Sequence, residues 1–368
     1  MIKNKCVGLY IHVPFCKSKC PYCNFYSFIP KSEVIDEYCK KIKNNLKKYP
    51  YSFDTVYFGG GTPSVLGAKK IADILSAVNF ESGSEITVEC NPSDTGSENE
   101  SFDFSLLKNA GVNRISMGLQ SAVDGERKLL GRKAGKEDIL KAVDRIVKSG
   151  ISNYSLDLML GIPEQTAESV DESLDFCLST GAKHISCYIL KIEDGTFFGK
   201  NRERYAFPDD DACSDFYLQT SEKLTNAGMN HYEISNFAFP GFESKHNNKY
   251  WNCEEYLGLG PSAHSFINGK RFFFPDSIED YLNGCNTVSD GEGGDKKEYL
   301  MLRLRLSEGI NFKEFEKKYG QTFSKEFYEK CSFFASVNLG LLTPAGFRLT
   351  PEGYLMSNRI IIELTELI

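Results

Sequence analysis

The sequence has no apolar run long enough to span a lipid bilayer and no surplus of positive charge. A transmembrane helix needs about 20 consecutive apolar residues, and no stretch of this chain reaches that length. The net charge of −7 gives no general attraction for nucleic acid phosphates. The first fifteen residues lack the basic, apolar and small-residue segments of a secretory leader. We therefore expect a cytoplasmic protein with no transmembrane segment and no nucleic acid partner.

The composition is that of a soluble globular protein, and it gives little reason to expect disulfides. The 368 residues are 41% hydrophobic and 25% charged, which suggests two or more domains around a large core. Nine of the twelve cysteines are scattered along the chain. A chain of this size buries a core without cross-links, so reduced thiols are expected. Cys6, Cys39 and Cys90 are expected to be buried as small apolar side chains.

The other three cysteines, Cys16, Cys20 and Cys23, stand within eight residues in the run CKSKCPYC. Three thiolates at this spacing can hold three irons of a [4Fe–4S] cube, and no fourth cysteine completes the run. The alternatives are a structural zinc ion or three inert thiols. Zinc usually takes four ligands at paired spacings, and the segment has no partner pair. The spacing therefore predicts a cluster with one open iron that can bind a ligand.

Strand-like runs alternate with amphipathic helical patterns over the first 190 residues. The expected strands are Val7–Val13, Thr55–Phe58, Glu85–Glu89, Arg114–Gly118, Tyr154–Leu160 and His184–Ile189. The expected helices are Glu33–Lys48, Lys69–Val78, Phe104–Ala110, Lys136–Ser149 and Ser169–Ser179. This order predicts an α/β fold whose parallel strands are joined by crossover helices. Polar or glycine-rich residues follow several strands, where such folds carry their chemistry.

The alternation weakens beyond about residue 195. A helix is expected around Asp210–Ala227, and others at Lys297–Leu306 and Phe312–Tyr319. A β-like element at Leu339–Leu349 precedes a final helix. These patterns predict a mainly helical, winged-helix-like C-terminal domain that packs on the rest of the chain instead of binding DNA.

Three segments are expected from these patterns. Residues 1–235 form the main α/β domain, residues 236–295 a connecting segment, and residues 296–368 the C-terminal domain. The polar, glycine-rich stretch Ser289–Asp295 is the most linker-like part of the chain and predicts a flexible connection.

A second group of interest lies in the run HNNKYW, which holds His246, Asn247, Tyr250 and Trp251, the last being the only tryptophan. An imidazole beside aromatic rings can ligate haem iron and enclose a flat macrocycle. A histidine in such surroundings is also often a core residue held by a hydrogen bond. Cys253, two residues further on, offers a competing thiolate ligand. The residues alone leave these alternatives open.

Eight runs in a fixed order carry a resemblance to a known family: YIHVPFCKSKCPYCNF, FGGGTP, VECNP, RISMGLQS, LDLMLGIPEQT, YEISNFA, HNNKYW and YLGLGPSAHS. They cover nearly the first 270 residues and resemble the HemW haem chaperones. These are radical S-adenosylmethionine (SAM) proteins related to oxygen-independent coproporphyrinogen III oxidase. The resemblance implies a partial (β/α)6 TIM-type barrel and a [4Fe–4S] cluster whose open iron is chelated by SAM.

The resemblance also implies the residues that contact these ligands. For SAM they are Tyr10, Tyr22, Gly60, Gly61, Thr62, Glu89, Gln120, Arg132 and Asp157. Acidic and amide groups suit ribose hydroxyls, and a guanidinium suits a carboxylate. For haem the implied residues are His246, Asn247, Tyr250 and Trp251. No catalytic residue is assigned.

The function implied by the resemblance is to bind haem and transfer it to acceptor haemoproteins. The alternatives are an oxidase that decarboxylates coproporphyrinogen III and a radical SAM enzyme acting on another tetrapyrrole. Two departures favour the chaperone. The oxidase pattern has a further cysteine where this chain has Phe25, and the oxidase has a longer extension than the nine residues before Tyr10. A shorter lid would leave a radical exposed to water, so oxidase activity is not expected.

The expected partners follow from the same resemblance. Haem acceptors are implied to include respiratory proteins, with delivery at the membrane face by a cytoplasmic protein. The sequence leaves open the electron donor of the cluster and whether the protein forms a homodimer.

Overall fold

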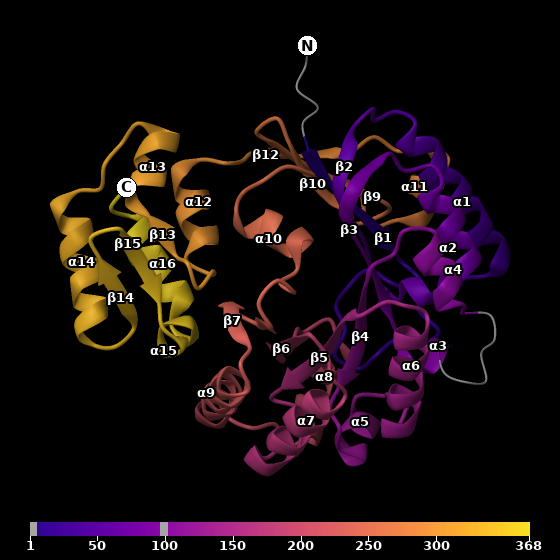
Figure 1. Ribbon diagram of the computed structural model, residues 1–368, viewed down its shortest axis with the longest axis horizontal. Coiled ribbons are helices and arrows are strands. Elements are labelled where there is room, and N and C mark those ends of the chain that lie inside the picture. Colours follow the sequence, from indigo (N-terminus) through magenta and orange to yellow (C-terminus); the bar gives the residue numbers. More distant parts are fainter. Residues whose placement is uncertain (1–5, 96–101) are drawn as a thin grey trace.

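The computed structural model describes residues 6–95 and 102–368, which form a large α/β barrel and a smaller C-terminal region (Figure 1). Six parallel strands build the barrel: β1 (Cys6–Val13), β2 (Ser52–Gly60), β3 (Phe80–Cys90), β4 (Arg114–Gln120), β5 (Asn153–Leu160) and β6 (His184–Ile189). They pair in chain order, as the alternating pattern predicts. The prediction of an α/β barrel with a helical C-terminal region is confirmed.

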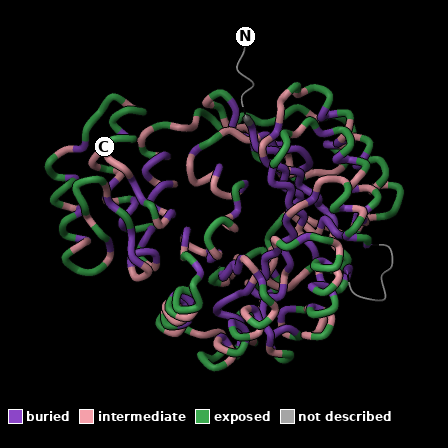
Figure 2. The backbone as a smooth tube through the Cα atoms, in the orientation of Figure 1, coloured by how far each residue is buried: buried purple, intermediate pink, exposed green. Residues whose placement is uncertain are grey.

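Helices connect these strands and cover the outside of the sheet (Figure 1). They are α1 (Ser32–Leu46), α2 (Ala68–Leu75), α3 (Pro92–Thr95), α4 (Phe104–Asn109), α5 (Asp124–Leu129), α6 (Lys136–Lys148), α7 (Ala167–Ser179), α8 (Phe197–Lys200) and α9 (Asp210–Asn226). Helix α6 buries Ile139, Ala142, Val143 and Ile146, one stripe at helical spacing. The strands lie in the buried interior in Figure 2, while the helices expose their outer faces.

Side chains along each strand alternate between these helices and the barrel interior. In β4, Ile115 and Met117 belong to the apolar core under the helices. Arg114, Ser116 and Gly118 line the interior. This period of two gives the barrel a polar inside, which is the surface available to a ligand.

The sheet continues beyond the six parallel strands at both edges. One edge carries the antiparallel pair β7 (Asn230–Glu233) and β8 (Asn236–Ala238) beside β6. At the other edge, β9 (Tyr256–Leu259) runs parallel to β1 and leads to β10 (His264–Ile267), β11 (Lys270–Phe273) and β12 (Val288–Glu292). Helices α10 (Lys245–Trp251) and α11 (Ile278–Asn283) lie among them.

This continuation corrects the expected role of residues 236–295. The segment was expected to connect two domains, but it supplies five strands, β8 to β12, of the main sheet. The expected flexible linker at Ser289–Asp295 largely forms β12, an exposed edge strand paired with β11. These strands are short and their partners are distant in sequence, so local patterns give little sign of them.

The C-terminal region holds a three-stranded antiparallel sheet and five helices. The strands are β13 (Ile310–Asn311), β14 (Gly340–Thr343) and β15 (Gly346–Leu349), in the order β13-β15-β14. The helices are α12 (Lys296–Arg303), α13 (Phe312–Tyr319), α14 (Lys325–Ser336), α15 (Pro351–Leu355) and α16 (Ser357–Thr365). Helix α14 was not expected. Helix α12 packs against α10, and the amide of Ile234 donates to the carbonyl of Arg305 at 2.9 Å, which attaches this region to the barrel.

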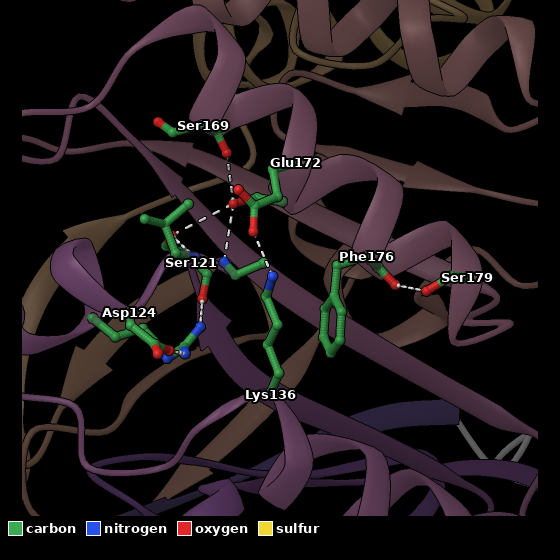
Figure 3. A network of polar contacts seen from close by, with 11 residues as sticks. Ser121, Asp124, Lys136, Ser169, Glu172, Phe176 and Ser179 are labelled. Atoms are coloured by element: carbon green, nitrogen blue, oxygen red, sulfur yellow. Dashed lines mark hydrogen bonds and ion pairs between the residues drawn. The ribbon is translucent and has the colours of Figure 1, made fainter.

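Polar contacts join neighbouring helices on the outer face of the barrel (Figure 3). Lys136 of α6 forms an ion pair with Glu172 of α7, and its ammonium lies over the ring of Phe176. Ser173 accepts a hydrogen bond from the amide of Ala122 at 2.9 Å. These contacts stabilise the helical layer without reaching the barrel interior.

Candidate functional site

A cavity of about 830 Å³ opens at the carboxyl ends of the barrel strands. Twelve of the residues predicted for the cluster, SAM or haem line it: Cys16, Cys20, Tyr22, Cys23, Gly60, Gly61, Thr62, Glu89, Gln120, Arg132, Asp157 and Asn247. They come from segments far apart in sequence, and most of them lie at or just after the carboxyl ends of parallel strands, where such folds place their ligands. Tyr10, His246, Tyr250 and Trp251 do not line this cavity.

The three clustered cysteines lie on the loop that follows β1. Two backbone hydrogen bonds close this loop: the amide of Cys16 donates to Phe28 at 3.0 Å, and the amide of Phe28 donates to Pro14 at 2.9 Å. The three thiols are partly exposed along one side of the cavity. Burial raises the pKa of Cys23. Within the described residues, no three His, Cys, Asp or Glu side chains are gathered closely around one ion position.

The donor set fits an iron–sulfur cluster. Three cysteine thiols are soft ligands, they come from one short loop, and they face a space large enough for a cluster and a further ligand. The remaining cysteines in the described residues are free thiols elsewhere, and Cys39 and Cys90 are buried as predicted. The side chain of Cys6 lies outside the described residues.

The glycine-rich turn after β2 holds the cysteine loop in place. The amide of Gly61 donates to the carbonyl of Val13 at 2.8 Å, and the amide of Thr62 donates to that of Phe15 at 2.7 Å. A Cβ on Gly61 would lie 2.7 Å from the Phe15 oxygen, too close for any other residue. The Cys16 thiol lies 3.4 Å from the Thr62 hydroxyl. The absence of side chains here allows the two loops to meet at the cavity wall.

Two carboxyl groups lie deep in the cavity, each held by hydroxyl donors. Tyr57 donates to Glu89 at 2.8 Å, and burial raises the pKa of Glu89 to about 7. Asp157 accepts hydrogen bonds from Ser186 at 2.8 Å and Ser116 at 3.1 Å. Burial raises the pKa of Asp157, and these hydroxyl groups oppose the rise. Both groups can accept hydrogen bonds from ribose-type hydroxyls in their ionised form.

Gln120 and Arg132 carry polar atoms that no described residue satisfies. Gln120 has a φ of 64°, a strained backbone conformation for this residue type, and its Oε1 is buried without a partner. Arg132 donates to the Tyr22 hydroxyl at 2.6 Å, while its Nε is buried without a partner. Buried polar atoms are usually paired, so these two side chains are suited to a polar ligand.

The HNNKYW segment forms α10, which closes the barrel at the end opposite to the cavity mouth. His246 is fully buried, with Nδ1 bonded to the Thr55 hydroxyl at 2.8 Å and Nε2 to the Tyr250 hydroxyl at 2.8 Å. Burial lowers the pKa of His246 to about 3. In this arrangement neither ring nitrogen is free to ligate an iron. Cys253 lies elsewhere, with its sulfur beside Gly294.

Tyr10 belongs to this closed region and not to the cavity wall. Its hydroxyl is bonded to Nδ1 of His12 at 3.2 Å, and its ring lies 6.4 Å from that of His246. Tyr57 stacks on His246 with the ring centres 5.2 Å apart. The only HNNKYW residue that lines the cavity is Asn247.

Sequence reasoning missed the polar residues that line the cavity from within the strands, including the first residues of β4 and β6. These are Arg114, Ser116, His184, Ser186 and Tyr188. One signal in the sequence could have identified them. A strand buried on both faces usually consists of consecutive apolar residues. In β4, polar or glycine residues alternate with apolar ones, which indicates that one face of the strand borders a polar interior.

Comparisons with known proteins agree with this architecture. The sequence profile of the Radical SAM superfamily matches residues 10–177, and that of the HemN C-terminal domain matches residues 297–356. The fold is similar to that of a solved coproporphyrinogen III oxidase, HemN, from Escherichia coli. The TM-score is 0.84 at 20% identity, covering 99% of this chain and 91% of the other.

Curated relatives match over almost the whole chain. A "Heme chaperone HemW" of Synechocystis is 37% identical, covering 96% of this chain and 95% of the relative. That of Bacillus subtilis is 33% identical, covering 95% of this chain and 97% of its own. Among the described residues no helix combines the length and apolar character needed to cross a membrane. From these matches, the chain belongs to the HemW family of the radical SAM superfamily.

Proposed function

We propose that this protein binds haem and transfers it to acceptor haemoproteins, and that it carries a [4Fe–4S] cluster with exchangeable SAM. The observation that carries the proposal is the similarity, at 31–37% identity over 82–98% of this chain, to relatives named heme chaperones. The arrangement of cysteine, glycine and polar residues around one cavity supports the cluster and SAM.

Each group has proposed holders. Cys16, Cys20 and Cys23 hold the cluster, and a reduced cluster supplies the electron that can cleave the sulfonium of SAM. Gly60, Gly61 and Thr62 offer backbone groups to the methionine part of SAM. Glu89, Gln120, Arg132 and Asp157 bind its polar groups, with Tyr22 held against Arg132. Tyr10 does not line the cavity, so its proposed contribution to SAM binding is indirect, through the residues that pack between it and the cavity.

The proposed haem residues remain His246, Asn247, Tyr250 and Trp251. Since both nitrogens of His246 are bonded, ligation requires its Nε2 to leave the Tyr250 hydroxyl. Helix α10 has only seven residues, and its first two amides are held by Glu85. A shift of this short helix would free the imidazole of His246. Haem binding would then be coupled to opening of the barrel floor, the end of the barrel that α10 closes.

We further propose a cytoplasmic protein that meets haem acceptors, including respiratory proteins, at the membrane face. Oxidase activity is not proposed. Phe25 stands where the oxidase pattern has a cysteine, and its side chain is 69% exposed at the cavity mouth, where it contributes no further thiol.

The test is an anaerobic titration of the reconstituted protein with haem, followed by absorption, together with an assay of coproporphyrinogen III decarboxylation. We expect stoichiometric haem binding and no decarboxylation. The Cys16/Cys20/Cys23→Ala variant should lose the four-iron species, whereas Cys331→Ala, which removes a buried thiol of the C-terminal region, should keep it. Robust decarboxylation, or the absence of haem binding, would contradict the chaperone function.

A further inference from the structure

Arg114, the first residue of β4, lies inside the barrel with a guanidinium group that has no hydrogen-bond partner. Its side chain is 2% exposed, and its Nε is buried without a partner. Across residues 6–95 and 102–368, no oxygen accepts a hydrogen bond from its other two nitrogens. A guanidinium carries five donor hydrogens, and burying them unpaired is costly.

The other buried arginines show how unusual this is. Arg127 donates to the carbonyl of Ser121 at 2.9 Å and forms an ion pair with Asp124. Arg303 donates to the carbonyl of Gly309 at 3.0 Å and to Glu308 at 2.9 Å. Buried guanidinium groups in this protein are therefore paired where the protein itself supplies oxygens, and Arg114 departs from that pattern.

The carboxylates near Arg114 are occupied by other donors. Glu85 accepts the backbone amides of Lys245 and His246 at 3.1 and 3.0 Å. Asp157 accepts the hydroxyls of the serines around it. Burial opposes the charge of Arg114, but Glu85 and Asp157 act on it through space and raise its pKa. These two groups therefore keep the guanidinium charged without using its donors.

The free donors face the cavity. Arg114 lines it together with Ser116, His184 and Asn247, below the residues proposed to bind SAM. A planar guanidinium matches a carboxylate through two parallel hydrogen bonds, which gives both affinity and orientation. The missing partner is thus an anion with two acceptor oxygens that enters from the cavity.

We propose that Arg114 anchors a carboxylate of the ligand that fills the inner part of this cavity. The proposal rests on the proposed function for the identity of that ligand, and the carboxylate is a propionate of haem. The methionine part of SAM is proposed to lie at the glycine turn beside the cysteine loop, away from Arg114. Anchoring by Arg114 would fix the ligand relative to the cysteine loop, which lies at the opposite end of the cavity.

The experiment compares Arg114→Met and Arg114→Lys with the wild-type protein and with Arg127→Met, a matched buried arginine outside the cavity. The probes are haem, haem dimethyl ester, SAM and decarboxylated SAM, titrated anaerobically into the cluster-loaded protein. We expect Arg114→Met to weaken haem binding by about tenfold or more, while the affinities for haem dimethyl ester, SAM and decarboxylated SAM are unaffected. Arg127→Met should leave all four affinities unchanged.

A loss for haem with its ester unaffected indicates the propionate, and the SAM pair serves as the control for the rest of the cavity. Equal affinities of Arg114→Met and wild type for haem would overturn the proposal, as would equal losses for haem and its ester. If Arg114→Met does not fold, Arg114→Lys decides by the same comparison, because it keeps the charge without the paired donors. A wild-type protein that binds no haem would refute the proposed function, whereas a wild type and an Arg114→Met protein that bind haem equally well would refute only the role of Arg114.

Discussion

The two ends of the barrel interior differ in how completely their polar groups are satisfied. At the cavity, Gln120, Arg132 and Arg114 all carry buried polar atoms without partners. At the floor, both nitrogens of His246 are bonded and its ring is stacked against Tyr57. A protein keeps unpaired buried groups only where something else compensates them. The comparison therefore teaches that the cavity is built for a ligand. At the floor His246 is satisfied, although Asn248 and Trp251 of α10 each keep one buried polar atom without a partner.

The same comparison bears on the HNNKYW segment. Of the residues predicted as a haem site, Asn247 lines the cavity, and His246 and Tyr250 are bonded to each other at the floor. The Nε1 of Trp251 is buried without a partner. Lys249 also has partners, since it forms ion pairs with Asp54 at 2.6 Å and Glu254 at 3.1 Å. In this conformation the segment therefore stabilises the fold, and haem could bind His246 only by displacing the hydrogen bonds of its ring.

The largest effect on stability is expected for a substitution of His246, the buried residue at the barrel floor. His246→Ala removes a buried ring and leaves the hydroxyls of Thr55 and Tyr250 without their partner, so we expect a loss of about 3 kcal/mol in the free energy of unfolding. Urea denaturation measures it, and Asn247→Ala is the control, with an expected loss below about 1 kcal/mol. Equal losses in both variants would remove the distinction between floor and cavity.

The floor also predicts a response to acid. The pKa of His246 falls to about 3 in the folded protein, below its ordinary value of 6.5. The unfolded chain therefore binds more protons between these values, so stability is lost as the pH drops below about 6.5. The loss should be less steep in His246→Ala than in the wild-type protein.

At the cavity, the affinity for SAM should depend on the protonation of Glu89. The pKa of Glu89 is about 7, and the carboxylate accepts ribose hydroxyls better than the acid does. Affinity should therefore rise by about tenfold per pH unit below pH 7 and level off above it. Titrations from acid to alkaline pH measure this rise. A Glu89→Gln protein should bind more weakly and with a flat profile, and a flat profile in the wild type would count against this role.

The smallest effect concerns the strained residue of the cavity. Gln120→Gly relieves a φ of 64° and removes an unpaired amide, so the protein should gain about 0.5–1 kcal/mol of stability while its SAM affinity falls. Thermal unfolding and SAM titration measure the two effects. Glu164→Gly is the matched control, because Glu164 has a φ of 65° on an exposed surface. It should gain stability without any change in SAM affinity.

Much of the architecture could be predicted because the six barrel strands and their helices follow local periodic patterns. For example, the expected strand His184–Ile189 has the bounds of β6. The strand β9 was missed because its four residues pair with β1, which lies almost 250 residues earlier. Local propensity carries no information on such a partner.

The candidate site likewise contains parts that could be predicted from the sequence and parts that could not. The cysteine loop and the glycine turn are each one short run of sequence, so both could be identified from their motifs. Arg114 could not, because an arginine at the start of a strand usually reads as a solvated charge. Its importance depends on the lack of acceptor oxygens around its guanidinium group, and only the three-dimensional structure shows this.

The pairing of β1 with β9 has a consequence for how the protein is made. The cysteine loop leaves the ribosome early, but the strand that presents it keeps one open edge until residue 256 has been synthesised. At roughly 5–20 residues per second, that delay lasts about 12–50 s. Iron delivered before that point would meet a cysteine loop whose preceding strand is paired on one side only. A truncated chain that ends before β9 should therefore hold its cluster less stably than the whole chain.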